Sequence, residues 1–252
     1  EDNKLYLGVK GEEGEKIPLL DFETKSKKTR ESVIIKLLHK AENVAEELFD
    51  RIGVRFITES RFDTLRVVKF LIDHNVVIPH NIKPSRSVNT IVDLSKFKEK
   101  HQNVMKMAIR NELSEERFLN AMDREAVDSS FIDNDGDRND HTSGKYQSLQ
   151  FTCRQLIKYK NPFLHEFNDL RKFAKEQEEG TELAKKVLSM DVSLIARDIR
   201  FFYPYEIQIV DEEAHRVNTE SKASHQEYKK SQVQSAMHRV FKSIIEYKNI
   251  KV

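Results

Sequence analysis

The sequence predicts an α/β domain in which a mixed β-sheet is flanked by helices. Short apolar runs typical of strands alternate along the chain with longer segments of helical periodicity. The chain has 252 residues, of which 38% are hydrophobic, with only 7 Gly and 5 Pro. It is therefore long enough to bury a core and poor in residues that break helices. We expect a single domain over 25–252, preceded by a loosely structured lead-in segment over 1–24.

The periodicity assigns most of the chain to specific elements. Apolar residues such as Val33, Leu37 and Val44 recur at helical spacing in the first long segment. Helices are expected over 30–48, 63–72, 95–126 with a break near Ser114, 162–179, 181–188 and 212–247. Strands are expected over 53–57, 76–78, 90–94, 146–159 and 203–211. The segments near 95–127 and 160–200 are interpreted as helical insertions into the domain.

Composition excludes several classes of protein. The formal net charge is +1, so the whole chain presents no general electrostatic attraction for nucleic acid or membrane. No apolar run reaches the roughly 18 to 20 residues that span a bilayer, and we expect no membrane partner. The single cysteine, Cys153, excludes an intramolecular disulfide framework and lies in an apolar run, which favours a buried structural thiol over a nucleophile. With no signal-like segment, the expected location is the cytoplasm.

The segment 203–211 carries the most informative side chains. Strand residues alternate between faces, so Glu206 and Gln208 project to one side while Ile207 and Ile209 project to the other. A carboxylate and an amide on a rigid strand suit metal binding or activation of a hydroxyl. A second strand far upstream follows Asp50, and we expect these two distant strands to build one site.

Other residues are typical of nucleotide binding. Lys28 and Lys36 flank Ser32 at the start of the first helix, where cations and free backbone N–H groups stabilise polyphosphates. The alternative is a solvated, lysine-rich helix start. Tyr146 follows a Gly-containing loop, where its ring is placed to stack on a base. The alternative for Tyr146 is a packing residue.

Four motifs follow one another along the chain. They are Lys28 with Ser32-Val33 and Lys36, then Asp50-Arg51-Ile52-Gly53-Val54-Arg55, then Gly144-Lys145-Tyr146-Gln147-Ser148-Leu149-Gln150, and finally Glu206-Ile207-Gln208-Ile209 followed by His215. In order and separation they resemble the motifs of the RelA/SpoT family of nucleotide pyrophosphokinases, which synthesise guanosine tetra- and pentaphosphate alarmones. The resemblance covers roughly residues 25–230 and implies the nucleotidyltransferase-like fold of the RelA/SpoT synthetases.

The resemblance implies Mg²⁺-assisted transfer of the β,γ-pyrophosphoryl group of ATP to a nucleotide hydroxyl. It implies that Asp50 holds Mg²⁺ and that Glu206 activates the acceptor hydroxyl or shares the metal. The residues implied to bind ATP are Lys28, Ser32, Lys36 and Arg55. Those implied to bind the acceptor nucleotide are Tyr146, Gln150, Gln208 and His215. Positioning and charge neutralisation dominate catalysis of phosphoryl transfer, and these residue types supply both.

The chain departs from the family pattern mainly on the acceptor side. Gln150 stands where the family has His, and Val210-Asp211 stands where it has Arg-Thr; on the donor side, Ser26 replaces an Arg. These changes leave the acceptor open between GDP, GTP and other nucleotides. The alternatives are a toxin-type synthetase acting on tRNA ends or adenosine nucleotides, and a non-catalytic nucleotide sensor or interaction module on the same fold. No His-Asp dipeptide occurs, so the family's metal-dependent alarmone hydrolysis is not expected.

RNA and a second copy of the chain are further candidate partners. Basic residues of the C-terminal helix offer an RNA-binding surface, and the alternative is a solvated helix face. These residues are Lys222, Lys229, Lys230 and Arg239. The sequence is compatible with an oligomer but does not specify one.

Overall fold

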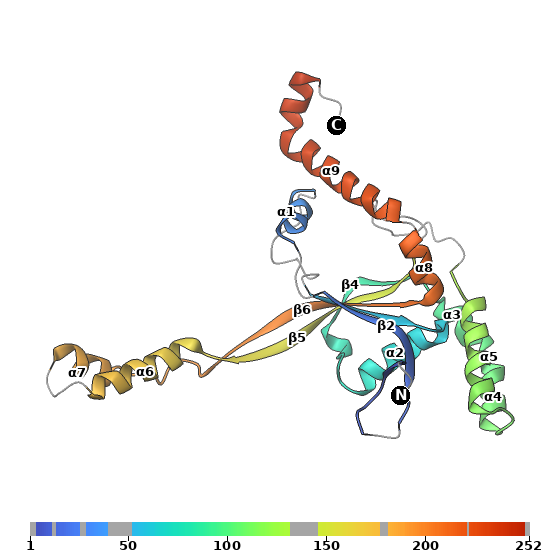
Figure 1. Ribbon diagram of the computed structural model, residues 1–252, viewed down its shortest axis with the longest axis horizontal. Coiled ribbons are helices and arrows are strands. Elements are labelled where there is room, and N and C mark those ends of the chain that lie inside the picture. The colour runs from blue at the N-terminus through green and yellow to red at the C-terminus, as the bar shows by residue number, and fades with distance from the viewer. Residues whose placement is uncertain are drawn as a thin grey trace. The chain divides into compact units, whose positions relative to one another are not determined.

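The computed structural model describes residues 4–11, 14–25, 29–39, 52–131, 146–176, 181–220 and 222–249 (Figure 1). A six-stranded sheet in the order β1-β2-β3-β6-β5-β4 organises the chain. The strands are β1 (Leu5–Leu7), β2 (Ile17–Lys25), β3 (Gly53–Thr58), β4 (Ile82–Asn89), β5 (Leu149–Lys160) and β6 (Asp198–Asp211). β3 pairs with β6 in parallel, whereas β1–β2, β2–β3 and β4–β5 are antiparallel. The predicted mixed sheet flanked by helices is confirmed at this level.

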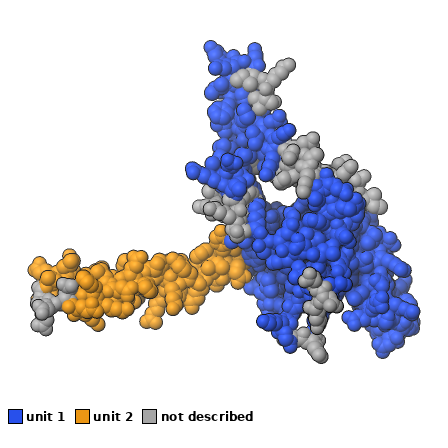
Figure 2. All heavy atoms as spheres, viewed as in Figure 1, with its two compact units in different colours: residues 1–153, 204–252 blue, residues 154–203 orange. Residues whose placement is uncertain are grey.

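The chain divides into two compact units (Figure 2). Unit 1 contains Glu1–Cys153 and Pro204–Val252, and unit 2 contains Arg154–Tyr203. Unit 2 consists of the outer parts of β5 and β6 with α6 (Pro162–Glu176) and α7 (Glu182–Ser189). In its own small core, Phe167, Ala174 and Val187 are buried together. The helices predicted over 162–179 and 181–188 correspond to α6 and α7.

One face of the sheet in unit 1 is apolar and packs on a helix. Phe56 of β3 and Ile207 and Ile209 of β6 alternate onto this face and are almost completely buried. Helix α2 (Arg61–Asp73) adds Val67 and Leu71 to the same cluster. Ser60 caps α2 by accepting a hydrogen bond from the Asp63 N–H, which satisfies one of the free N–H groups of the first turn.

A second buried cluster holds the inserted helices. α3 (Leu94–Lys100), α4 (Gln102–Ile109) and α5 (Glu115–Asp128) bury Phe97, Val104 and Met122 in it. The predicted break near Ser114 is confirmed, since the Ser114 hydroxyl caps the start of α5. These helices occupy the region predicted as the first insertion.

The prediction that the lead-in over 1–24 is loosely structured was wrong. Residues 5–7 and 17–25 form the hairpin strands β1 and β2, and β2 joins the sheet through β3. Ile17 and Leu19 are buried in the apolar cluster, so tertiary packing stabilises a segment that Gly-rich flanks had marked as irregular. The turn between the strands includes Gly11 with a φ of 87°, a conformation that favours glycine.

Two short predicted strands are also absent from the structure. Residues 76–78 and 90–94 are not strands; the strand between them is β4, at the end of the sheet order. Val77 and Ile91 are instead buried from loop positions. Pro84 lies within β4, and an edge strand tolerates a residue that lacks an N–H.

The C-terminal helices follow the prediction closely. α8 (Glu212–Glu220) and α9 (Lys222–Lys248) occupy the segment predicted over 212–247. α9 packs against α1 (Arg30–His39), and residues 40–48 of the predicted first helix lie outside the described part of the chain. The Arg239 guanidinium donates to the carbonyls of Leu37 and Leu38 at the end of α1. Arg239, which was predicted as one of the RNA-binding cations, therefore contacts the end of α1. No helix among the described residues is long and apolar enough to cross a membrane.

Candidate functional site

The second face of the sheet in unit 1 carries polar side chains, which the pairing between β3 and β6 brings together. In this parallel ladder Gly53 is opposite Glu206, and Arg55 is opposite Gln208. Arg55, Glu206 and Gln208 are therefore neighbours on the face opposite the apolar cluster. The side chains that alternate with them, Phe56 and Ile207, are held in the core, which fixes the register of both strands.

A chain of hydrogen bonds connects this face to β5. The Nε of Arg55 donates to Oε1 of Gln208 at 2.8 Å. The Nε2 of Gln208 donates to Oε1 of Gln150 at 3.0 Å, and the Nε2 of Gln150 donates to Oε1 of Glu206 at 2.6 Å. Because arginine can only donate and an ionised glutamate can only accept, the two ends orient both amides between them.

Tyr146 belongs to the same cluster. Its hydroxyl oxygen accepts a hydrogen bond from Nε2 of Gln208 at 2.7 Å. Burial raises the pKa of Tyr146; the nearby Arg55 opposes this rise and the Glu206 carboxylate adds to it. The phenol therefore keeps its O–H proton. Five residues predicted for the site, Arg55, Tyr146, Gln150, Glu206 and Gln208, lie in one hydrogen-bonded cluster.

Helix α8 holds the segment that carries Tyr146. The Asn218 side chain donates to the carbonyl of Gln147 at 2.7 Å and accepts from the Gln147 N–H at 3.0 Å. Such a two-bond clamp on the next residue restrains the backbone at Tyr146. The sequence analysis did not identify Asn218, because its partner lies 71 positions away in the chain.

Glu23 is a site residue that the sequence analysis missed. It pairs with Arg55 across the β2–β3 ladder, and its Oε2 accepts a hydrogen bond from Nη1 of Arg55 at 2.8 Å. Together Gln208 and Glu23 hold two nitrogens of one guanidinium and so fix its plane. Asp21 and Glu23 alternate within 17–24, but this segment was interpreted as part of the irregular lead-in.

Asp211, a departure from the family pattern, has a structural role. Its carboxylate pairs with the buried Arg61 at 2.8 Å and accepts the Ala214 N–H at 3.2 Å, which caps α8. Arg61 also donates to the Ser130 hydroxyl. Asp211 therefore joins the end of β6 to the starts of α8 and α2.

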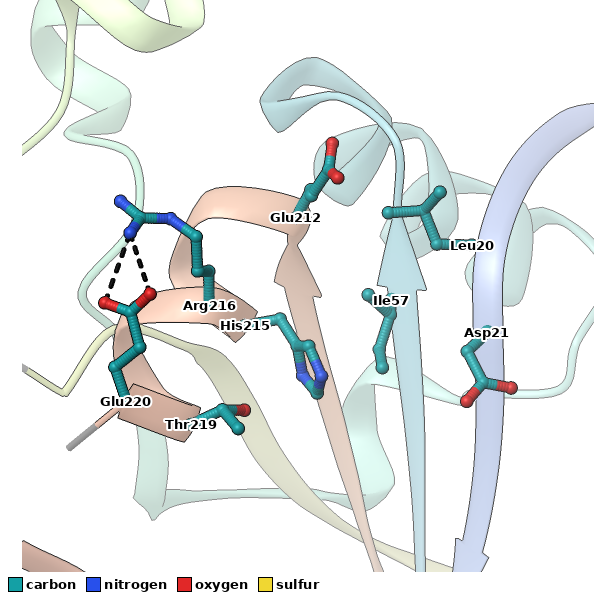
Figure 3. Close-up of a pocket in the computed structure, with 8 residues that line it drawn as sticks. All are labelled: Leu20, Asp21, Ile57, Glu212, His215, Arg216, Thr219 and Glu220. Carbon is teal, nitrogen blue, oxygen red and sulfur yellow. Dashed lines mark hydrogen bonds and ion pairs between the residues drawn. The ribbon is translucent and has the colours of Figure 1, made fainter. Parts of the chain in front are cut away.

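His215 lies apart from the cluster, in an open cavity of about 490 Å³. Figure 3 shows His215 on α8 with Ile57 of β3 and Asp21 of β2 on the other side of the cavity. Arg216 and Glu220 at its rim form an ion pair at 2.9 Å. Ile57 follows Arg55 by two residues on the same strand face, so the cavity begins about 7 Å further along β3.

The residues predicted to hold the triphosphate are only partly described. Ser32 and Lys36 lie one turn apart on α1, and the Ser32 hydroxyl accepts a hydrogen bond from Thr29 at 2.8 Å. Lys28 and Asp50 lie outside the described residues. Ile52, two residues after Asp50, accepts a hydrogen bond through its carbonyl from the Glu206 N–H at 2.9 Å. Ile52 is thus anchored beside Glu206.

Two further predictions concern a magnesium site and the single cysteine. Within the described residues, no group of three or more His, Cys, Asp or Glu side chains is arranged to hold a metal ion. The predicted magnesium pair includes Asp50, which lies outside that search. Cys153 is 1% exposed, and burial raises the pKa of its thiol to about 11, so the predicted buried structural thiol is confirmed.

Comparison with known proteins adds no family assignment. The chain matches no protein-family model and no curated protein sequence.

Proposed function

We propose that this protein is a Mg²⁺-assisted pyrophosphokinase of the RelA/SpoT type, which transfers the β,γ-pyrophosphoryl group of ATP to a hydroxyl of an acceptor nucleotide. One observation carries the proposal. Side chains from three motifs that are distant in the sequence lie in a single hydrogen-bonded cluster on one sheet face. Arg55, Tyr146 and Glu206 are among them. A buried core on the other face makes that arrangement rigid.

Arg55 is well suited to bind the adenine of ATP. Gln208 and Glu23 hold two edge nitrogens of its guanidinium, and its side chain remains 38% exposed. A guanidinium held at its edge can stack its flat face on an aromatic base. In this proposal Lys28, Ser32 and Lys36 contact the triphosphate.

Glu206 is the chemical centre of the proposed reaction. The acceptor hydroxyl oxygen bonds to the β-phosphorus of ATP while the bond from that phosphorus to the oxygen bridging the α-phosphate breaks, and AMP leaves. The hydroxyl proton passes to the Glu206 carboxylate. The Gln150 amide holds one oxygen of this carboxylate at 2.6 Å and so orients it. Tyr146 offers its ring for the acceptor base and its O–H as a donor.

The carboxylates fit a magnesium site by their chemistry. Mg²⁺ prefers hard oxygen ligands, and Glu206 presents a half-buried carboxylate on β6, where its backbone N–H donates to the carbonyl of Ile52. Asp50 and Glu206 are the residues that would hold the ion. When bound, Mg²⁺ would neutralise charge on the triphosphate.

The direct test measures AMP formation. The purified protein is incubated with ATP, Mg²⁺ and a panel of acceptors that includes GDP, GTP, ADP and tRNA, and products are identified by mass. We expect AMP with at least one acceptor, and a loss of at least a thousandfold in the Asp50→Ala and Glu206→Ala variants. Glu166→Ala removes an exposed glutamate of unit 2 and serves as the matched control.

The outcomes separate the proposed enzyme from its rivals. Undiminished AMP formation by Glu206→Ala, in a variant that melts like the parent, would contradict the assigned chemistry. AMP formed only with tRNA would identify a toxin-type transferase. Nucleotide binding without AMP for any acceptor would favour a sensor, an alternative consistent with Gln150 at the position where the family has His.

A further inference from the structure

The outer parts of β5 and β6 form an exposed ribbon in unit 2. The ribbon comprises residues 154–160 of β5 and 198–203 of β6, which are neighbours in the sheet. Leu156 is 47% exposed and Phe202 is 55% exposed. An isolated two-stranded ribbon is only marginally stable. The buried core of α6 and α7 at its end restrains this one.

The ribbon has a strong excess of positive charge. The ribbon carries the exposed cations Arg154, Lys158, Lys160 and Arg200, and the exposed Arg197 directly precedes its second strand. Its acidic residue is Asp198, which pairs with Lys158 at 3.2 Å. Lys160, Arg197 and Arg200 form no ion pair within the described part of the chain. The helices α6 and α7 instead mix acidic and basic residues, so the cation excess belongs to the strands.

The cations gather on one face of the ribbon. The ion pair between Lys158 and Asp198 places these two side chains on the same face. By strand alternation, Arg154 and Lys160 of β5 share this face, as do Arg200 and Phe202 of β6. On β5 the cations of this face recur at every second or fourth residue, and β6 adds Arg200 and the exposed ring of Phe202.

We propose that this cationic face binds single-stranded RNA. A row of cations that follows a phosphate backbone, together with an aromatic side chain on which a base stacks, is the arrangement that recognises single strands without strong sequence preference. A duplex hides the faces of its bases from Phe202, whereas RNA exposes them in loops, bulges and ends. This site is separate in its residues from the proposed catalytic cluster, and the proposal does not depend on catalysis.

The test measures binding of fluorescently labelled 20-nucleotide single strands to the full chain by anisotropy over a series of salt concentrations. For single strands, the logarithm of the affinity falls with the logarithm of salt by about 0.7 for each phosphate neutralised. We expect the double substitution Lys160→Ala and Arg200→Ala to reduce this slope by about 1.4. Phe202→Ala should weaken binding by about fivefold or more at every salt concentration without changing the slope.

Matched variants make the outcome specific to the ribbon. Lys175→Ala with Lys185→Ala removes two exposed cations from α6 and α7 and should leave the affinity and the slope unchanged. Equal losses in this control would overturn the assignment to the ribbon. Failure to bind RNA at 50 mM salt, or tighter binding of single-stranded DNA or of a duplex of the same length, would overturn the assignment to single-stranded RNA. Thermal melting of each variant checks that the fold is retained.

Discussion

The two faces of β3 and β6 alternate residue by residue but have different roles. On one face Phe56, Ile207 and Ile209 are buried against α2 and hold the strands in register. On the other face the Arg55 guanidinium donates a hydrogen bond to the Gln208 amide within a polar cluster. The first face contributes mainly to folding stability, while the second positions groups for chemistry. Substitutions on adjacent residues should therefore separate stability from binding.

The largest effect on stability is expected on the apolar face. Ile207 is 1% exposed in the main cluster, and replacing it by alanine leaves a cavity among side chains that cannot fully close it. We expect Ile207→Ala to lower the free energy of unfolding by about 2 to 5 kcal/mol, and Ile207→Val by about 0.5 to 1.5 kcal/mol. Urea unfolding followed by circular dichroism measures both. A loss below about 1 kcal/mol for Ile207→Ala would show that this face is not the stabilising one.

The adjacent residue on the polar face should behave in the opposite way. Gln208→Leu keeps the approximate size of the side chain but removes its bonds to Arg55, Gln150 and Tyr146. We expect a change in unfolding free energy within about 1.5 kcal/mol but roughly a tenfold weaker affinity for ATP, because the guanidinium of Arg55 is no longer held. Calorimetry with ATP and with inorganic tripolyphosphate distinguishes a base contact from a phosphate contact.

The control and the contrary outcome for this variant are clear. Gln155→Leu makes the same chemical change at an exposed position on β5 in unit 2, and should leave ATP affinity unchanged. If Gln208→Leu weakens tripolyphosphate and ATP equally, Arg55 does not contact the base. If it leaves both affinities unchanged, the polar cluster is not a nucleotide site.

The two faces of β6 could be predicted from the sequence, because they depend on local periodicity. The period of two in 203–211 separated Ile207 from Gln208 correctly, since Ile207 and Ile209 are buried while Glu206 and Gln208 are only half-buried. The sequence analysis also expected the two distant strands to come together, but the specific pairing of Arg55 with Gln208 is seen only in the structure. The chemical roles of these residues depend on the family resemblance and stay predictions.

The parts that could not be predicted depend on contacts between distant segments. Glu23 becomes relevant only because β2 pairs with β3, and that pairing is stabilised by Ile17 and Leu19 in a core assembled from the whole chain. Asp211 similarly gains its role from Arg61, which lies 150 positions away. Short apolar runs such as 76–78 were also ambiguous, because a buried loop residue and a strand residue share the same composition.

The smallest expected effect concerns pH and lies at the edge of the apolar face. Cys153 and Tyr205 influence each other's pKa, and the Tyr205 hydroxyl donates to the carbonyl of Val76 at 3.0 Å. Burial raises the pKa of Cys153 from 9.0 to about 11 and that of Tyr205 from 10.0 to about 12. Both groups therefore lose their protons more readily in the unfolded chain than in the folded one.

The sign of the pH dependence follows from these shifts. The stabilisation from Cys153 and Tyr205 is fully present below pH 9 and is lost as the pH rises toward the folded values of about 11 and 12. We expect urea unfolding at pH 8, 10 and 11 to show a falling free energy of unfolding. Tyr205→Phe should be less stable than the parent at pH 8, because it lacks the bond to Val76, but should lose less stability between pH 10 and 11. Equal losses in the two proteins would show that the Tyr205 hydroxyl titrates alike in the folded and unfolded chains, and would place it outside the buried face.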